Sequence, residues 1–163
     1  EAVCEDGPVD ILPCGRSLAG ARAADPTALL DALAAVDREY GQVVVDAPAG
    51  LGADVGLPLF AADAVILVTT PDEAAIADAL RVRALADELD GGLARVVVNR
   101  ADGRAPDAGV ADLFGAPVVT VPESTAIAVA RAREQPLATV APSSPACDAF
   151  EELADACYSV SRL

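Results

Sequence analysis

The chain has 163 residues, of which 53% are hydrophobic, and its 26 acidic and 11 basic residues give a formal net charge of -15. This length fits a single domain with its own core. The charge argues against nonspecific nucleic-acid binding, which needs a basic stripe, and the apolar content argues against disorder. No apolar run approaches the roughly 18 residues of a membrane span.

The acidic excess has two interpretations. Adaptation to molar salt explains it, because the Debye length falls to about 3 Å at 1 M and the repulsion between surface carboxylates is screened. GC-rich coding explains why every basic residue is arginine, but it does not explain the carboxylates. We expect no signal peptide and a cytoplasmic protein. The chain contains no methionine, even at position 1, and we therefore expect it to be incomplete at its amino terminus.

Short apolar runs alternate with helical patterns along the whole chain. Three of the runs, VVV, VILV and VVV, are continuously hydrophobic, which is typical of strands covered on both faces of a parallel sheet. The predicted strands are Val9 to Leu12, Val43 to Val45, Ala64 to Thr69, Arg95 to Val98 and Val118 to Val121.

The helices between these strands have recognisable ends. Asp25 caps the first, Pro26 takes its first position, and the helix ends near Tyr40. Thr70 and Glu73 have the spacing of a capping box for the next helix, which Gly91-Gly92 would stop. Further helices are predicted over Pro106 to Phe114, Ser124 to Arg133 and Cys147 to Val160.

The alternation of strands and helices predicts an α/β fold: a doubly wound, mostly parallel sheet with helices on both faces, formed by residues 1–163 as a single domain. Ligands of such sheets bind at the carboxyl ends of the strands. Asp46, Thr69-Thr70, Asn99 and Pro122 all follow predicted strands closely, so we expect them along one edge.

Asp46 has two interpretations from the residues alone. A carboxylate at the end of a hydrophobic strand can hold Mg²⁺ through a coordinated water, and Gly50 and Gly52 would let backbone amides approach a phosphate. Alternatively, Asp46 only caps a turn, as Asp before a proline-containing turn often does. The four cysteines offer no CxxC pair and the chain has no histidine, so a zinc site is not expected.

The ordered segments VVVDAPAGLG, FAADAVILVTTPDEAAIADALRVRALADEL, RVVVNRADG and PVVTVPESTAIAVARAREQPLATVAPSSPACDAF resemble the MinD/ParA group of deviant P-loop ATPases. The resemblance runs from about Leu12 to Ala154 and includes LPCGRSLAGARAADP, which is similar to the segment before the acidic strand in the MinD branch. It implies a P-loop NTPase type of fold that binds ATP and Mg²⁺.

The resemblance also implies a role for each matching residue on the phosphate side. Asp46 matches the catalytic Walker B acid, which supports Mg²⁺ through water. Ala49 and Gly50 match the start of the switch segment that senses the γ-phosphate.

On the base side, Asn99 matches the residue whose amide reads the adenine edge, and Arg100 matches one whose stem packs near the base. Pro122 and Glu123 match the turn that lines the adenine pocket through its backbone. Alternatives remain: Asn99 as a left-handed turn residue before Asp102-Gly103, and Glu123 followed by Ser124 as no more than a helix start. Ser124 departs from the family, which usually has an acid there.

The larger departure is the lysine-rich phosphate loop, which the family places near the amino terminus and which is not in these residues. The chain thus resembles the carboxyl-terminal two-thirds of such an ATPase, and by itself we expect it not to turn over ATP. For the intact parent, the resemblance implies an ATP-driven homodimer and an activating protein partner. Direct nucleic-acid binding is not expected, and membrane association is expected only through a partner or missing sequence, because the tail lacks a basic amphipathic helix.

Two other hypotheses stay open. The chain is a noncatalytic protein-interaction scaffold that kept the sheet and lost the phosphate loop, or it is a flavodoxin-like domain unrelated to nucleotides. The flavodoxin hypothesis does not account for the ordered run of motifs. An upstream glycine- and lysine-rich loop in the full reading frame would favour the ATPase over the scaffold.

Overall fold

The structure is a computed structural model that describes residues 3–4, 9–13, 25, 27–102 and 108–160. It divides into two compact units, residues 1–44 and 45–163. The first unit contains α2 (Thr27–Glu39), close to its predicted bounds. The predicted strand at Val9 to Leu12 is wrong, since only an isolated antiparallel bridge between Cys4 and Ile11 forms there. Pro26, predicted at the first position of the helix, lies outside the described residues, as do Cys14 and most of the segment from Leu12 to Pro26.

The second unit is built on a three-stranded parallel sheet in the order β1-β2-β3. Apolar β-branched residues dominate all three strands, as the sequence predicts for a buried parallel sheet. Their bounds are β1 (Val65–Thr69), β2 (Leu93–Ala101) and β3 (Val118–Pro122).

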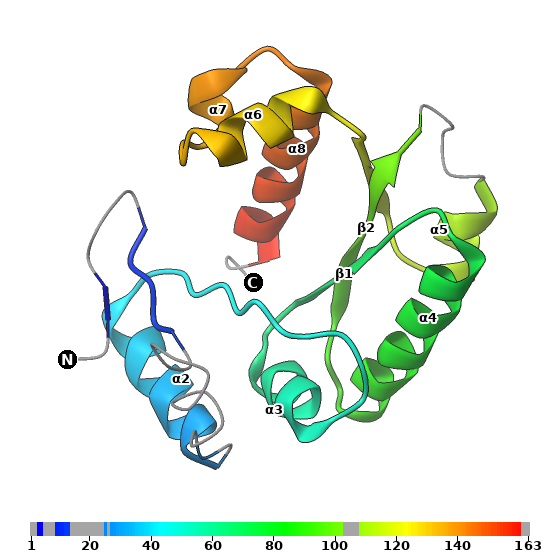
Figure 1. The fold of residues 1–163 in the computed structure, drawn as a ribbon. Coiled ribbons are helices and arrows are strands. Elements are labelled where there is room, and N and C mark those ends of the chain that lie inside the picture. The colour runs from blue at the N-terminus through cyan, green and yellow to red at the C-terminus, as the bar shows by residue number, and fades with distance from the viewer. Residues whose placement is uncertain (1–2, 5–8, 14–24, 26, 103–107, 161–163) are drawn as a thin grey trace. The chain divides into compact units, whose positions relative to one another are not determined.

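Helices connect and cover these strands (Figure 1). Neither the helix before β1 nor the short one before the last helix is predicted from the sequence. Pro106, predicted to start a helix, lies outside the described residues. The helices are α3 (Ala53–Ala61), α4 (Glu73–Glu88), α5 (Ala108–Phe114), α6 (Thr125–Ala132), α7 (Leu137–Val140) and α8 (Pro145–Val160).

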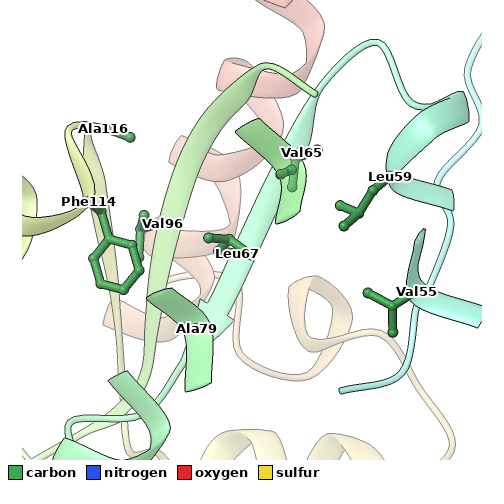
Figure 2. Packing of buried hydrophobic residues seen from close by; sticks show 9 residues of the cluster. Val55, Leu59, Val65, Leu67, Ala79, Val96, Phe114 and Ala116 are labelled. Atoms are coloured by element: carbon green, nitrogen blue, oxygen red, sulfur yellow. The ribbon is translucent and has the colours of Figure 1, made fainter. Parts of the chain in front are cut away.

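One face of the sheet packs against α3, α4 and α5 around a cluster of buried apolar residues. Figure 2 shows Leu59 of α3 beside Val65 of β1, and Phe114 of α5 beside Val96 of β2. Val96 and Phe114 are both completely buried. At about 25 cal/mol for each Å² of apolar surface removed from water, this cluster is a main source of stability for the unit.

The other face packs against α8. Val97 of β2 and Val119 and Val121 of β3 form a second buried cluster with Ala149 of α8. Because successive strand residues point to opposite faces, Val96 and Val97 contribute to different clusters. Figure 1 shows α4 and α8 on opposite sides of the strands. The expected parallel sheet with helices on both faces is therefore confirmed.

Two local predictions are wrong. Residues Val43 to Val45 form no strand, and Val44 is 84% exposed, because none of the described strands pairs with this segment. The capping box at Thr70 does not form either: the N-cap of α4 is Asp72, two residues later, and the Thr70 hydroxyl instead donates to the Asp72 carboxylate at 2.7 Å. Among the described residues, no helix has the length and apolarity to cross a bilayer.

Candidate functional site

The carboxyl ends of the three strands place three of the predicted residues along one edge of the sheet. Thr69 is in register with Val98, and Asn99, the next residue of β2, is in register with Val121 of β3. Pro122 then follows opposite Ala101. Because the strands are parallel, Thr69, Asn99 and Pro122 belong to the same edge, where ligands of doubly wound sheets bind.

A bulge in β2 shapes this edge. The register between β2 and β3 shifts between Asn99 and Ala101, and Arg100 between them has a φ of 57°. The backbone N–H of Arg100 donates to Oδ1 of Asn99 at 2.9 Å. Bulges that re-aim side chains and left-handed non-glycine residues both concentrate at functional sites. The left-handed residue is thus Arg100, and the alternative that Asn99 takes this conformation is wrong.

The hydrogen bond from Arg100 fixes the Asn99 side chain but does not use all of its hydrogen-bonding groups. The amide of Asn99 keeps its two N–H donors, and its oxygen keeps a second lone pair. Asn99 is half-buried, and the Arg100 side chain is exposed. The edge therefore presents an oriented group that can both donate to and accept from a ligand.

The turn after β3 is held against β2. The backbone N–H of Glu123 donates to the carbonyl of Ala101 at 3.0 Å, so the pairing of the two strands continues past Pro122. Ser124 then caps α6, because its Oγ accepts from the N–H of Ala126 at 3.2 Å. The interpretation of Ser124 as part of a helix start is confirmed. That the Glu123 backbone lines a pocket remains a prediction.

The turn after β1 is ordered by threonine hydroxyls. Thr69 is buried, at 5% exposure, and its Oγ1 donates to the Thr70 carbonyl at 3.3 Å. The Thr70 hydroxyl is already used by Asp72. These two threonines therefore shape the edge rather than offer free donors to a ligand.

Asp46 and Gly50 lie in an irregular, exposed stretch that leads into α3. Gly50 has a φ of 117°, which side-chain-bearing residues rarely adopt, so this position requires glycine. Asp46 does not end a strand here, contrary to the prediction. Its assignment to the edge near Asn99 remains a prediction, since no described contact joins the two.

The residues fit part of a nucleotide and magnesium site. The oriented amide of Asn99 suits the donor and acceptor pattern of adenine. Mg²⁺ commonly keeps several waters and uses only one or two protein carboxylates together with phosphate oxygens, so the single exposed carboxylate of Asp46 suits it. These residues do not supply the phosphate-binding loop, because the chain has no lysine to contact the phosphates.

Similar proteins of known sequence and structure bear on the fold and on this candidate site. No family model matches the chain. It is 32% identical over 155 residues to an uncharacterized ATP-binding protein of Methanocaldococcus jannaschii, covering 91% of the chain and 59% of that protein. It is 34% identical over 127 residues to a putative septum site-determining protein MinD of Nephroselmis olivacea, covering 72% of the chain and 46% of that protein.

Among solved structures, the cell division ATPase MinD of Pyrococcus furiosus superposes with a TM-score of 0.85 at 23% identity, covering 98% of the chain and 70% of that structure. The septum site-determining protein MinD of Pyrococcus horikoshii, solved with Mg-ADP, gives a TM-score of 0.82 at 24% identity over 94% of the chain and 66% of that structure. At these identities the structural likeness defines the fold alone.

The fold is that of a P-loop NTPase of the MinD/ParA type. Together with the sequence relatives, it confirms the resemblance: the chain is related to the MinD-like P-loop ATPases. It spans 59% of the length of the first of these curated relatives and 46% of the second.

Proposed function

We propose that the chain is the base-binding part of a MinD-like ATPase whose intact form binds ATP and Mg²⁺. The observation that carries this proposal is the edge formed by Thr69, Asn99 and Pro122, in which the bulge at Arg100 orients the Asn99 amide. Asn99 would read the adenine edge, the Arg100 stem would pack near the base, and the backbone at Pro122 and Glu123 would line the pocket.

Asp46 would act as the Walker B acid and hold Mg²⁺ through water, and Gly50 would begin the segment that senses the terminal phosphate. When bound, Mg²⁺ supplies electrostatic stabilisation of the phosphate oxygens during phosphoryl transfer to water. In the intact cytoplasmic protein, a lysine-bearing phosphate loop outside these residues would complete the site. ATP hydrolysis would then drive a homodimer switch, under an activating protein partner, for the spatial regulation of cell division or partition.

The test is ATP binding by the full-length protein in molar KCl, with and without Mg²⁺. Asp46→Ala should remove the Mg²⁺-dependent part of the affinity. Asn99→Ala should weaken ATP binding by about fivefold while leaving the Mg²⁺ dependence intact, since a desolvated hydrogen bond contributes about 1 kcal/mol. Wild-type behaviour of both variants would remove the two residues from the site. For the 163-residue chain alone we expect weak or undetectable binding, so micromolar affinity would show that the phosphate loop matters less.

A noncatalytic scaffold that keeps the sheet without a phosphate loop is the second candidate. In this case the sheet and helices serve only to present a binding surface to other proteins. The complete reading frame discriminates between the two candidates. A glycine- and lysine-rich loop after a hydrophobic strand supports the ATPase, and a full-length protein without one supports the scaffold.

A further inference from the structure

Helix α8 covers one face of the sheet, and it does so mainly through small side chains. It packs against β3 and β2, and Leu153 adds a half-buried larger side chain to this contact. Because stabilisation scales with the apolar area removed from water, such a contact holds a helix less firmly than large side chains would. Among the described side chains of α8, the buried ones are Ala146, Cys147, Ala149 and Ala156.

The outer side of α8 is acidic. Asp148, Glu151 and Glu152 are all exposed, and the two glutamates stand three and four residues after the aspartate. Residues at these spacings are neighbours on a helix surface, about 5–6 Å apart between Cβ atoms, and two like charges there destabilise the helix. Asp155 repeats the spacing, three residues after Glu152 and four after Glu151. The sequence of α8, PACDAFEELADACYSV, contains no arginine or lysine to offset these charges.

The helix α4, on the other face of the sheet, arranges its charges differently. It also has 16 residues, but its two arginines lie next to carboxylates of the same helix. Arg81 pairs with Asp78, and Nε of Arg83 lies 3.6 Å from the Asp87 carboxylate. Repulsion between like charges at neighbouring positions is thus a feature of α8 and not of α4.

The negative charge of α8 also reaches its buried side. Sγ of Cys147 lies 4.0 Å from Oε1 of Glu151. Burial, and then the carboxylates of Glu151 and Asp148, raise the pKa of this thiol. The strands beneath α8 offer little to offset the charge, since β3 contains no basic residue and Nη1 of Arg95 in β2 donates to the Ala94 carbonyl at 2.8 Å.

We propose that α8 is a salt-sensitive cover: at low ionic strength, repulsion among its carboxylates favours a local opening that uncovers Val97, Val119 and Val121, and screening at high ionic strength closes it. The Debye length is about 10 Å at 0.1 M salt, longer than the spacing of the paired charges, and about 3 Å at 1 M, shorter than that spacing. The cluster on the other face of the sheet stays packed, because none of its described residues belongs to α8.

The opening has a consequence for the edge of the sheet. Val121, which loses its cover, directly precedes Pro122 and is in register with Asn99. Loss of packing there would loosen the edge at which we expect the base to bind. This consequence rests on the proposed function, whereas the opening itself does not, so the opening is tested without nucleotide.

Cys147 reports whether α8 is closed. The residue is 3% exposed, so N-ethylmaleimide reaches its thiol only through an opening. The full-length protein is labelled at about 0.1 M and about 1 M KCl, and mass spectrometry follows the peptide that contains Cys147. A change in the reactivity of the thiol itself would have the opposite sign, because unscreened carboxylates keep the thiol protonated and only the thiolate reacts. Faster labelling at low salt therefore means opening.

The double variant Glu151→Gln, Glu152→Gln removes the like-charge pairs of α8 and keeps a similar helix propensity. Its matched control is Glu73→Gln, Glu88→Gln in α4. The control makes the same change in net charge at two exposed glutamates, and neither has a carboxylate three or four residues away within α4.

The wild type should be labelled at least about threefold faster at the lower salt concentration, since each like-charge pair shifts a helix equilibrium by about 1.5- to 2-fold. The α8 variant should lose this dependence and the α4 control should keep it. At about 1 M KCl the three proteins should be labelled at rates within about twofold of one another, which shows that the fold is intact.

Hydrogen exchange separates a local opening from global unfolding. At the lower salt concentration the amides of α8 should exchange faster, while those of Val96 to Val98 keep their protection. Parallel loss of protection in both segments would overturn the proposal, since salt would then stabilise the whole fold. No salt dependence of labelling in the wild type, or the same dependence in the wild type and both variants, would overturn it as well.

Discussion

Residues 43–46 read VVVD and residues 96–99 read VVVN, yet only the second triplet forms a strand. Val97 is 3% exposed, and Val44, at the matching place of the first triplet, is 84% exposed. The two segments have the same three side chains and therefore the same intrinsic preference for extended backbone. Local sequence does not explain the difference.

The neighbours of each segment do explain it. β2 pairs with β1 on one edge and with β3 on the other, and its alternate side chains enter the clusters on the two faces of the sheet. Val43 to Val45 pair with no described strand, at the junction between the two units. A valine triplet is stabilised as a strand only where partners satisfy its backbone groups and cover its side chains.

The largest expected effect comes from placing a charge in each triplet. Val97→Asp should destabilise the chain by about 3–5 kcal/mol, because it leaves an uncompensated charge between β2 and α8. Val44→Asp should change stability by no more than about 0.5 kcal/mol, as for other exposed positions. Urea unfolding followed by circular dichroism measures both.

The wild-type chain is the reference, and the denaturant slope should be unchanged in Val44→Asp. A destabilisation of several kcal/mol by Val44→Asp would mean that the first triplet is buried in solution. The two triplets would then not differ in burial.

Hydrogen exchange compares the backbones of the two triplets without any mutation. Amides of Val96 to Val98 should be protected on the order of 1000-fold or more, since core strands exchange only through large openings. Amides of Val43 to Val45 should exchange at close to the rate of an unfolded chain. Mass spectrometry of peptides covering each triplet gives the two values, and protection of the first triplet would indicate a strand partner for it.

The sequence predicts those parts of the fold whose neighbours lie nearby along the chain. The three strands of the second unit and the helices between them follow from apolar patterning, and each strand finds its partner across one helical crossover. Val43 to Val45 and Val9 to Leu12 show the same patterning, but their pairing depends on partners that patterning cannot name. The helix α3 is missed because its glycine and proline, Gly56 and Pro58, read as breakers.

The candidate site divides in the same way. That Thr69, Asn99 and Pro122 share an edge follows from strand order alone, and the structure confirms it. The bulge that puts Arg100 at a φ of 57° and fixes the Asn99 amide has no signal in the sequence, since arginine is not a residue that favours a left-handed conformation. Asp46 remains a prediction from the resemblance.

Gly50 tests whether the segment after the first triplet is ordered even though the triplet itself forms no strand. Gly50→Ala should destabilise the chain by about 1 kcal/mol, because alanine at a φ of 117° is strained. Gly41→Ala, where a Cβ meets open space and the φ is not positive, is the matched control with an expected change near zero. Equal urea midpoints for the two variants would show that the Gly50 backbone is not held in this conformation.

The smallest effect concerns the turn that leads from α4 into β2, the strand that does form. Asp90 has a φ of 58° and stands just beyond the negative end of the helix. Asp90→Asn keeps a residue that tolerates this conformation and removes the unfavourable charge, so it should stabilise the chain by about 0.5 kcal/mol at low salt.

The control is Asp102→Asn, which removes an exposed carboxylate that follows a strand rather than a helix and should change stability by no more than about 0.2 kcal/mol. At about 1 M salt the gain from Asp90→Asn should shrink, since charges are screened beyond about 3 Å. A gain of several kcal/mol would mean that turn chemistry decides whether β2 forms. A gain near 0.5 kcal/mol is small beside the loss expected for Val97→Asp. It would show that β2 is stabilised mainly by the strands and helices that pack around it.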